Sequence, residues 1–462
     1  MKVVVLGAGL GGLSASYELA KKGVDVTVLE KEGRVGGMAK SHSEGGFTYD
    51  LGPHRFHTKE DSLVEHVNRL LDGDLDEKER VSRILLEGRF FDYPLKVGNA
   101  FFNMPPSTTA RIMLDYTTMK LRNILGGGED GNFEEWVLSR FGRKLYEIYF
   151  KVYTEKTWGI PCTELSADWA AQRISLLSLW DTLVKTLSIG ETPRTYVSRF
   201  HYPRSHGIGR ISEAYERGIR DRGGKIRVSS PVKEVTASGG RITGIGYDGG
   251  TIKVGDDDIV FNTIPITDFI RCVSPKPPDD VLEANERLRF RSIVFVYLKF
   301  DRDRVSHDHW IYLPELKYKA NRVSESKNFN AGNTPDGKTI VGAEITCQMG
   351  DETWNASKEE LSERVLKDMV GIGLVEEGEY IDSTVRKMEH AYPVYDLTYR
   401  ENLDTAIDYL KGFANLRFFG RNGLFRYNNM DHSIHMGLKA AEAATDKNVD
   451  YMKVATEERW FG

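Results

Sequence analysis

The sequence predicts an α/β fold, in which a Rossmann-like dinucleotide-binding domain is assembled from discontinuous segments beside a helical lobe and an antiparallel-sheet domain. First, a Gly-x-Gly-x-x-Gly turn directly follows an apolar run at residues 3–6. Second, short strand-like runs broken by glycine pairs recur at 223–263 and 416–423. Third, residues 107–187 show helical apolar spacing, whereas residues 289–347 alternate β-branched and aromatic residues. We expect residues 1–75, 195–265 and 405–462 to form the dinucleotide-binding domain, residues 100–194 the helical lobe, and residues 76–99 with 266–404 the substrate-binding sheet domain.

The first glycine turn has the spacing of a dinucleotide-binding fingerprint. Gly7 allows a tight turn, Gly9 lets the backbone approach a pyrophosphate, and Gly12 lets the next helix pack closely on the strand. The pyrophosphate then lies at the N-terminus of that helix. A second strand ends at Glu30, whose carboxylate can accept hydrogen bonds from a ribose 2′-hydroxyl. The order of strand, glycine turn, helix, second strand and acidic residue argues against an ordinary glycine turn. The contact of Glu30 with a 2′-hydroxyl favours FAD or NAD over NADP.

A second glycine pair separates FAD from NAD. Arg34 is followed by Gly36 and Gly37, which bring another piece of backbone to the dinucleotide. This pattern resembles large FAD-binding oxidoreductases rather than dehydrogenases. The strand and glycine turn at 416–423, followed by a helical pattern over 433–445, are expected to close over the flavin.

Composition narrows the function classes. The chain of 462 residues has 40% hydrophobic residues, which is enough for more than one core. Its formal net charge is −5 and no long basic run is present, so nucleic acid is not an expected partner. Cys162, Cys272 and Cys347 lie far apart without a Cys-x-x-Cys spacing, and we expect buried free thiols in a reducing compartment.

Targeting and metal signals are missing from the sequence pattern. No run reaches the roughly 18 apolar residues of a membrane span, and the fingerprint begins too early for a signal peptide to precede it. A cytoplasmic protein is therefore expected. His54 and His57 have a His-x-x-His spacing, but no carboxylate or cysteine partner lies nearby in sequence, so we expect no metal site.

Several ordered segments carry a resemblance to a known family. The chain resembles the UDP-galactopyranose mutases and, more loosely, the protoporphyrinogen-oxidase and amine-oxidase-like flavoproteins. The matching segments are Gly-Pro-His-Arg-Phe-His-Thr at 52–58, Tyr-Thr-Glu-Lys-Thr-Trp-Gly at 153–159 with Arg-Ile at 173–174, Arg-Val-Ser-Glu-Ser-Lys-Asn-Phe at 322–329, Tyr-Pro-Val at 392–394, and the Gly-Arg segment at 420–421 through Tyr427, Met430 and Leu438.

The resemblance implies roles for individual residues. Arg173 and Arg322 are expected to clamp a diphosphate, because planar guanidinium groups pair with phosphate oxygens in a bidentate manner. Tyr153 and Trp158 can offer aromatic faces to a uracil ring, or they can pack a helical core. The resemblance also places His54 beside the isoalloxazine ring, Asp92 near the sugar, and Tyr392 where its phenol can donate to a phosphate. It adds further cofactor contacts to the glycines, Glu30 and Arg34; these are His54, Val232, Gly420, Arg421 and Met430.

The resemblance also implies an activity without net oxidation. Reduced flavin would attack the anomeric carbon of a nucleoside diphosphate sugar such as UDP-galactose and form a flavin–sugar adduct, which recloses with a different ring size. His54, Arg173 and Arg322 are then the catalytic candidates, and no protein nucleophile is needed. The implied partners are the sugar nucleotide, NAD(P)H or another reductant of the flavin, and a possible second copy of the chain.

Three departures from the mutase pattern keep other functions open. Glu344-Ile345-Thr346-Cys347 contains no tyrosine where the mutases carry one for the diphosphate. Phe91-Asp92-Tyr93-Pro94 has a carboxylate in place of an amide, and residues 429–433 look more like eukaryotic mutases and oxidase-like relatives. The sequence therefore leaves two alternatives, an FAD-dependent oxidase or desaturase and a non-catalytic flavin-binding scaffold.

Overall fold

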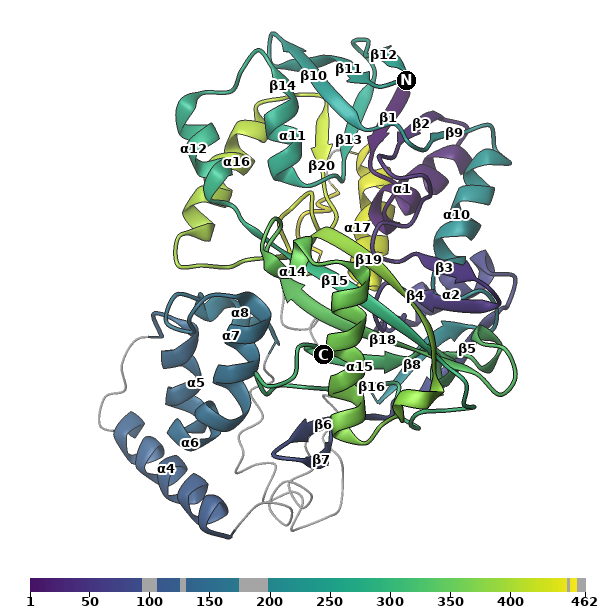
Figure 1. Cartoon of the computed structure of the whole chain (residues 1–462). Helices are drawn as coiled ribbons and strands as arrows, with labels where there is room; N and C mark the ends of the chain where they lie inside the picture. Colours follow the sequence, from purple (N-terminus) through teal and green to yellow (C-terminus); the bar gives the residue numbers. More distant parts are fainter. Residues whose placement is uncertain (94–105, 125–129, 174–197, 447–448, 455–462) are drawn as a thin grey trace.

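The computed structural model describes residues 1–93, 106–124, 130–173, 198–446 and 449–454. Figure 1 shows three parts: a parallel sheet with its helices, a large mostly antiparallel sheet beneath it, and a group of helices beside the large sheet. The α/β class and the assembly of the first part from distant segments are confirmed.

The first part is built on a five-stranded parallel sheet of order β20-β13-β1-β2-β9. Its strands come from three separate regions of the chain. The apolar residues of β1 from Val3 to Leu6 are completely buried, as expected for a parallel strand covered on both faces. The strands are β1 (Lys2–Leu6), β2 (Asp25–Leu29), β9 (Lys225–Arg227), β13 (Ile259–Asn262) and β20 (Leu416–Phe418).

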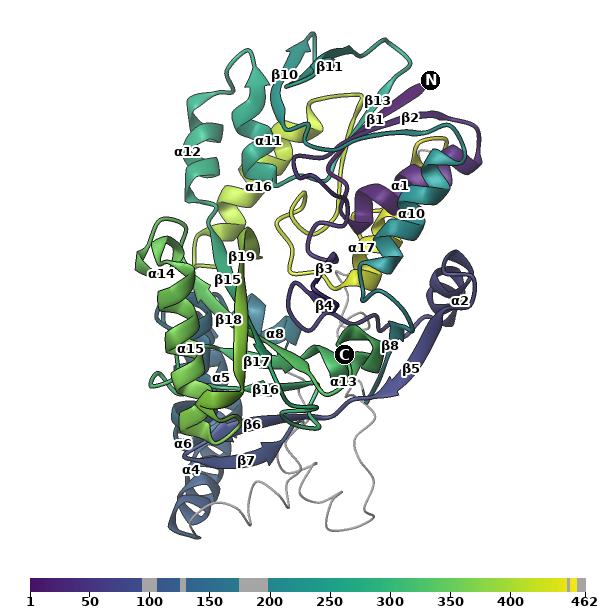
Figure 2. The same ribbon diagram turned by 45° about the vertical axis from the view of Figure 1, so that its right-hand side comes forward.

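Helices flank this sheet on both sides. Figures 1 and 2 show α1, α10 and α17 together on one side and α11, α12 and α16 on the other. The helix expected over 433–445 begins three residues earlier, where Asn429 and His432 form a capping box. The helices are α1 (Leu10–Lys21), α10 (Arg210–Arg220), α17 (Met430–Ala443), α11 (Ile266–Cys272), α12 (Asp279–Arg287) and α16 (Tyr399–Lys411).

A separate four-stranded sheet has the order β12-β11-β10-β14. Residues from β10 pair with β11 and β14, so they are not available to extend the parallel sheet. Its strands are β10 (Val232–Ser238), β11 (Arg241–Tyr247), β12 (Gly250–Lys253) and β14 (Val273–Ser274).

The large sheet has seven strands in the order β19-β15-β18-β17-β16-β6-β7. Helix α15 (Lys358–Ile372) covers one face, and the other face is directed toward the parallel-sheet part, which explains why β15 is buried along its whole length. The strands are β6 (Ser82–Leu86), β7 (Arg89–Asp92), β15 (Phe290–Phe300), β16 (Trp310–Tyr312), β17 (Arg322–Glu325), β18 (Thr339–Cys347) and β19 (Tyr380–Pro393).

The helical lobe has its own apolar core, which includes Phe133, Trp136, Tyr146 and Trp158. It consists of α4 (Pro106–Ile124), α5 (Phe133–Phe141), α6 (Arg143–Leu145), a π-helical turn (Tyr146–Lys151), α7 (Val152–Trp158) and α8 (Ala167–Arg173). The other elements are β3 (Ser41–Glu44), β4 (Phe47–Asp50), α2 (Asp61–Leu70), β5 (Leu75–Glu79), β8 (Arg199–Pro203), α13 (Ser326–Phe329), α14 (Glu352–Asn355) and two 3-10 turns (Ala331–Asn333 and Glu377–Glu379).

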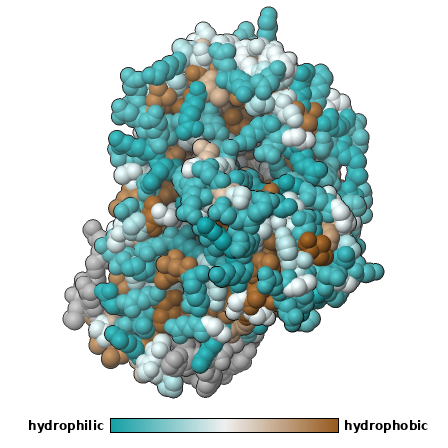
Figure 3. Space-filling model, viewed as in Figure 1, coloured by the Kyte–Doolittle hydropathy of each residue, from teal (hydrophilic) through white to brown (hydrophobic). Residues whose placement is uncertain are grey.

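Within the described ranges, no helix combines the length and the apolar character needed to cross a bilayer. The face shown in Figure 3 is mostly hydrophilic, with apolar residues scattered over it. Cys162, Cys272 and Cys347 are free thiols, and Cys162 and Cys347 are buried.

Candidate functional site

The glycine turn after β1 leaves room where a dinucleotide would approach. A Cβ atom built on Gly9 meets no other atom within 4 Å, and one built on Gly37 meets only the Gly9 Cα at 3.3 Å. Gly9 and Gly36 form a parallel bridge, and the Gly36 amide donates to the Ala8 carbonyl at 2.8 Å. The second glycine pair therefore lies beside the first, as the sequence predicted, and the two turns form an open cradle of backbone.

The other two fingerprint glycines have a packing role. Gly7 has a φ of +97°, which favours glycine. A Cβ atom on Gly12 would lie 2.2 Å from the Gly7 carbonyl oxygen, so α1 packs on β1 at a distance that only glycine permits.

Glu30 is buried at the end of β2 and joins the two turns. Its carboxylate accepts hydrogen bonds from the amides of Ala8 at 2.8 Å and Glu32 at 2.9 Å. The exposed Arg34 donates to the Ser41 carbonyl at 2.7 Å, which holds the chain after Glu30 against β3. A buried carboxylate beside an open glycine cradle fits the ribose-binding end of a dinucleotide.

The C-terminal segment lies over this cradle. Gly420 has a φ of +82°, and its Cα is 3.6 Å from a Cβ built on Gly11. Helix α17, which begins at the buried Met430, packs against α1 so closely that a Cβ on Gly437 would lie 2.0 Å from the Ser14 hydroxyl. Val232 begins β10 and is half-buried.

A polar row crosses the large sheet on the face opposite α15. Tyr312, Arg322, Glu344 and Phe295 are paired directly across four neighbouring strands, β16, β17, β18 and β15. Directly opposed residues of antiparallel strands point to the same face. The next row on this face includes Trp310 and Tyr297.

The turn that follows β4 lies on this polar row. A Cβ on Gly52, whose φ is +85°, would be 3.2 Å from the Phe295 ring and 3.3 Å from a Glu344 oxygen. The Tyr297 hydroxyl donates to the Asp50 carbonyl and receives the Gly52 amide at 3.3 Å. The first part of the molecule and the large sheet therefore meet at residues 50–55.

Arg322 and Glu344 form a bidentate ion pair in the centre of the row. The Nε and Nη2 groups of Arg322 donate to the two Glu344 oxygens, each at 2.8 Å. Their side chains are 19% and 6% exposed, respectively. Burial lowers the pKa of Arg322, but Glu344 outweighs this effect and the pKa lies well above its ordinary value. Arg322 is therefore a permanently charged group, and its three N–H groups that do not face Glu344 can bind a ligand.

Aromatic side chains from three other segments surround this pair. Tyr153 of α7 contacts Tyr312 edge to face, with 5.8 Å between ring centroids. Tyr392 stacks on Tyr427 at 5.2 Å, and Arg421 lies 4.3 Å from the Tyr427 ring. Burial raises the pKa values of Tyr153 and Tyr392, so both phenols are protonated hydrogen-bond donors at neutral pH.

Arg421 is fixed by backbone carbonyls. It donates to Asn428 at 2.5 Å and to Ala391 at 2.8 Å. These bonds connect the turn after β20 with the end of β19. Arg421 therefore joins the segment over the glycine cradle to the aromatic wall, which is the group of Tyr153, Tyr312, Tyr392 and Tyr427.

His54 lies between these charged groups. Burial is the main reason that its pKa falls to about 4, and the guanidinium groups of Arg322 and Arg421 lower it further. A backbone group of Leu51 partly offsets this shift, and the buried Nδ1 of His54 has no hydrogen-bond partner within the described parts of the chain. His54 is consequently a neutral imidazole at physiological pH, with one buried nitrogen that can respond to a bound ring.

This neutral state predicts a pH effect on stability. The unfolded chain binds a proton at His54 below about pH 6.5, but the folded protein does so only near pH 4. Stability should therefore rise with pH across this window, by about 3 kcal/mol from this group at full effect. His54→Gln should flatten the stability curve between pH 4 and 6.5 in urea unfolding, whereas His307→Gln at an exposed histidine should not. Superimposable curves for wild type and His54→Gln would contradict this assignment.

Two predicted substrate residues, Trp158 and Asp92, do not lie on the polar row, and the prediction for a third, Arg173, is not tested. Trp158 is 2% exposed and packs against Trp169, Tyr392 and Tyr427, so it supports the aromatic wall from behind and presents no free face to a uracil ring. Asp92 ends β7, an edge strand two positions from β16. Arg173 is the last residue of α8, and its side chain lies outside the described residues.

The structure adds Glu344, Tyr312 and Arg55 to the site. A lone carboxylate in the apolar strand 339–347 was the sequence signal for a buried ion pair at Glu344. Tyr312 gave no signal, because β16 has only three residues. Arg55 stood within the matched 52–58 segment, but its neighbours became known only from the fold.

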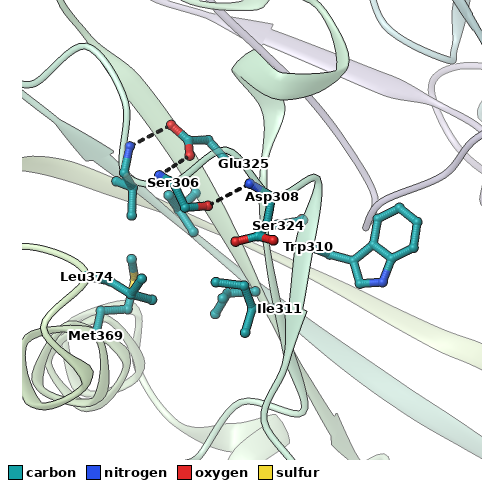
Figure 4. A pocket seen from close by; sticks show the side chains of 11 residues that line it. Ser306, Asp308, Trp310, Ile311, Ser324, Glu325, Met369 and Leu374 are labelled. Atoms are coloured by element: carbon teal, nitrogen blue, oxygen red, sulfur yellow. Dashed lines mark hydrogen bonds between the residues drawn. The ribbon is translucent and has the colours of Figure 1, made fainter. Parts of the chain in front are cut away.

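A small hollow on the α15 side of the large sheet is a different place from this site (Figure 4). Glu325 there accepts hydrogen bonds from the amides of Val305 at 2.9 Å and Ser306 at 2.8 Å and from Thr339 at 2.7 Å. These bonds hold a loop, and Trp310 points away from Met369 and Leu374 in this view. In the part of the chain that the structure describes, no three His, Cys, Asp or Glu side chains are grouped as metal ligands.

Comparisons with known proteins agree with a flavin site. A family model for flavin-containing amine oxidoreductases matches residues 10–444. A zeta-carotene-forming phytoene desaturase of Myxococcus xanthus is 23% identical over 415 residues, covering 80% of this chain and 77% of the relative. A "Probable UDP-galactopyranose mutase" of Klebsiella pneumoniae is 27% identical over 172 residues, covering 36% and 43%.

Solved structures show the same fold. A crystal structure of reduced UDP-galactopyranose mutase superimposes with a TM-score of 0.86 at 20% identity, covering 99% of this chain and 98% of the other. Putrescine oxidase bound to putrescine gives a TM-score of 0.64 at 16% identity, covering 96% and 98%. The resemblance to both groups is confirmed at the level of the fold. Because the family model spans nearly the whole chain and the glycine cradle fits a dinucleotide, this protein belongs to the flavin-containing amine oxidoreductase family.

Proposed function

We propose that this protein is a flavin-dependent mutase that interconverts the pyranose and furanose forms of a nucleoside diphosphate sugar. The observation that carries the proposal is the buried Arg322, which lies among the phenols of Tyr153, Tyr312 and Tyr392. A guanidinium with free N–H groups and surrounding phenol donors suits a diphosphate. An apolar polyene would instead require a mainly hydrophobic lining.

Glu344 is compatible with this role. It occupies only one edge of the Arg322 guanidinium, through Nε and Nη2. The carboxylate fixes the direction of the remaining N–H groups and reduces the cost of keeping Arg322 buried. We infer that Glu344 takes over the positioning of Arg322 in a site that lacks the expected tyrosine.

The flavin would be held by the glycine cradle, Glu30 and the segment around Gly420. When bound and reduced, it supplies the nucleophile for the anomeric carbon, so the protein needs no nucleophilic side chain. The chain's own tasks are to hold the departing diphosphate at Arg322, to orient the sugar along the aromatic wall and to exclude water.

The proposal includes further partners. The substrate is a sugar nucleotide of the UDP-galactose type. NAD(P)H or another reductant supplies electrons to the flavin. Two copies of the chain can associate. The reduced flavin is required because an oxidised ring is not nucleophilic.

Ring contraction by the reduced enzyme is the direct test. Holoenzyme reduced with dithionite and incubated with UDP-galactopyranose should produce UDP-galactofuranose, resolved by liquid chromatography. The oxidised holoenzyme is the matched control and should produce none. Other UDP-hexoses then define the sugar. The proposal fails if no furanose forms from any of them.

The alternative is an FAD-dependent oxidase or desaturase. The match to a phytoene desaturase over 80% of the chain favours it. Oxygen consumption with an amine, or formation of conjugated double bonds in a polyene, by the oxidised holoenzyme would support this alternative. The charged row at Arg322 and Glu344 argues against it, since buried charges oppose binding of an apolar chain.

A further inference from the structure

Arg55 occupies a position beside the polar row that the proposed mechanism does not use. Its guanidinium lies 4.7 Å from the centre of the Trp310 ring, on the sheet face shared with Tyr312 and Arg322. Trp310 projects to this face and away from the hollow under α15 (Figure 4). Arg55 is deep enough for burial to lower its pKa to about 10, yet it keeps part of its surface exposed.

The counter-charge of the neighbouring Arg322 is already assigned. Arg322 is neutralised by Glu344, to which it donates two hydrogen bonds of 2.8 Å. Arg55 forms no ion pair with any residue in the described ranges, and its Nε is buried without a hydrogen-bond partner there. As far as the described ranges go, Arg55 therefore keeps an uncompensated charge, whereas Arg322 does not.

Arg55 is surrounded by other cations and by phenol groups, all of which can donate hydrogen bonds. Burial is the main cause of the lowered pKa of Arg55; Arg80 and Arg322 lower it further, whereas the phenols of Tyr312 and Tyr93 raise it. Tyr93 and Tyr312 contact each other edge to face at 5.0 Å. Several cations and hydroxyl groups thus face one small region, with Glu344 as the carboxylate of the row.

Packing on Trp310 does not explain this arrangement energetically. A cation–π contact contributes about 0.5–2 kcal/mol. Desolvation of a buried ion costs several kcal/mol unless an opposite charge offsets it. An anionic ligand would provide that charge and would use the free N–H groups of Arg55.

We propose that Arg55, together with Tyr312, forms a second anion subsite that receives an anionic oxygen group of the substrate, either a phosphoryl or a carboxylate group. The identity of this substrate as a sugar nucleotide rests on the proposed mutase function. The subsite would favour nucleoside diphosphates that carry one anionic group bound at Arg322 and a second anionic group that extends to Arg55. Arg55 is then a specificity-determining residue.

The test compares Arg55→Gln with wild type in the oxidised holoenzyme, using calorimetric titration with inorganic pyrophosphate, UDP, UDP-galactose and UDP-galacturonate. We expect at least a tenfold loss of affinity for one class of ligand. A loss for pyrophosphate and all three nucleotides assigns the phosphoryl group to Arg55, and a loss confined to UDP-galacturonate assigns a sugar carboxylate. Arg55→Lys, which keeps the charge, should retain most of the affinity.

Arg364→Gln is the matched control, because Arg364 is an exposed arginine of α15 on the other face of the large sheet. It should bind all four ligands like wild type. Unchanged binding of all four by Arg55→Gln would overturn the subsite, and so would loss of FAD or of cooperative unfolding in that variant. If pyrophosphate binding falls in Arg55→Gln but the reduced enzyme contracts no sugar ring, the subsite stands and the mutase proposal fails.

Discussion

Replacing Arg322 with alanine is expected to remove sugar-nucleotide binding and also to destabilise the fold. The guanidinium is the charged group at the centre of the polar row, and loss of such a contact costs about 2–5 kcal/mol of binding free energy. Dissociation constants for UDP should therefore increase roughly 30-fold to several thousand-fold. Calorimetric titration of the holoenzyme with UDP measures this change.

The stability effect has a separate physical cause. The variant leaves Glu344, whose side chain is 6% exposed, without its cation. Breaking a buried pair in this way costs about 3–5 kcal/mol in the free energy of unfolding. Urea unfolding of Arg322→Ala should show this loss at pH 7.

A double variant separates the two effects. Arg322→Met with Glu344→Met removes both charges and keeps apolar volume, which is often neutral or stabilising for a buried pair. It should unfold close to wild type and still fail to bind UDP. If the double variant bound UDP normally, Arg322 would be a structural residue and the diphosphate would bind elsewhere.

Substitutions at two glycines of the fingerprint, Gly9 and Gly12, are expected to affect different properties: one the binding of FAD, the other the stability of the fold. In Gly12→Ala the new methyl group would lie 2.2 Å from the Gly7 carbonyl, so α1 must move away from β1. Such overpacking typically costs about 1–3 kcal/mol, and contact with rigid backbone places this variant at the upper end. In Gly9→Val the side chain enters open space, and Gly9 already has a φ of −74° that any residue adopts.

Gly9→Val should therefore unfold like the wild-type apoprotein but lose FAD, because the side chain fills the cradle. Flavin absorbance per protein should fall more than tenfold, while the urea midpoint of the apoprotein stays the same. Gly371→Ala, in α15 with open space around its Cβ, is the control: it should keep its FAD, and its urea midpoint should rise slightly, because alanine favours the helix. Full FAD occupancy in Gly9→Val would place the dinucleotide away from this turn.

The cofactor half of the site was predictable because its parts are local in sequence. Gly7, Gly9 and Gly12 act through the geometry of one strand, one turn and one helix. Glu30 follows the next strand, so its place beside the turn comes from a single β-α-β unit. The distant closing segment at Gly420 was also found, since it repeats the pattern of a strand followed by a glycine turn and a helix.

The substrate half was predicted less completely. Arg322, Tyr153 and Tyr392 meet at one place, but Trp158 lies behind the aromatic wall in the core of the helical lobe. Whether an aromatic ring faces a ligand or a core depends on a helix rotation that sequence spacing does not specify. The ion pair of Arg322 likewise required the register of β17 on β18.

By itself, the sequence determined the α/β class, the discontinuous dinucleotide-binding fold, the flavin cradle and the family resemblance. The first three follow from backbone sterics and apolar periodicity along each segment, whereas the family resemblance follows from the matched motif segments. Only the tertiary structure decided that Glu344 compensates Arg322 and that Arg55 has no counter-charge among the described residues. Arg322 and Glu344 are 22 residues apart in the chain and meet only through the register of β17 on β18. The surroundings of Arg55 exist only after the large sheet and the turn at 50–55 have come together.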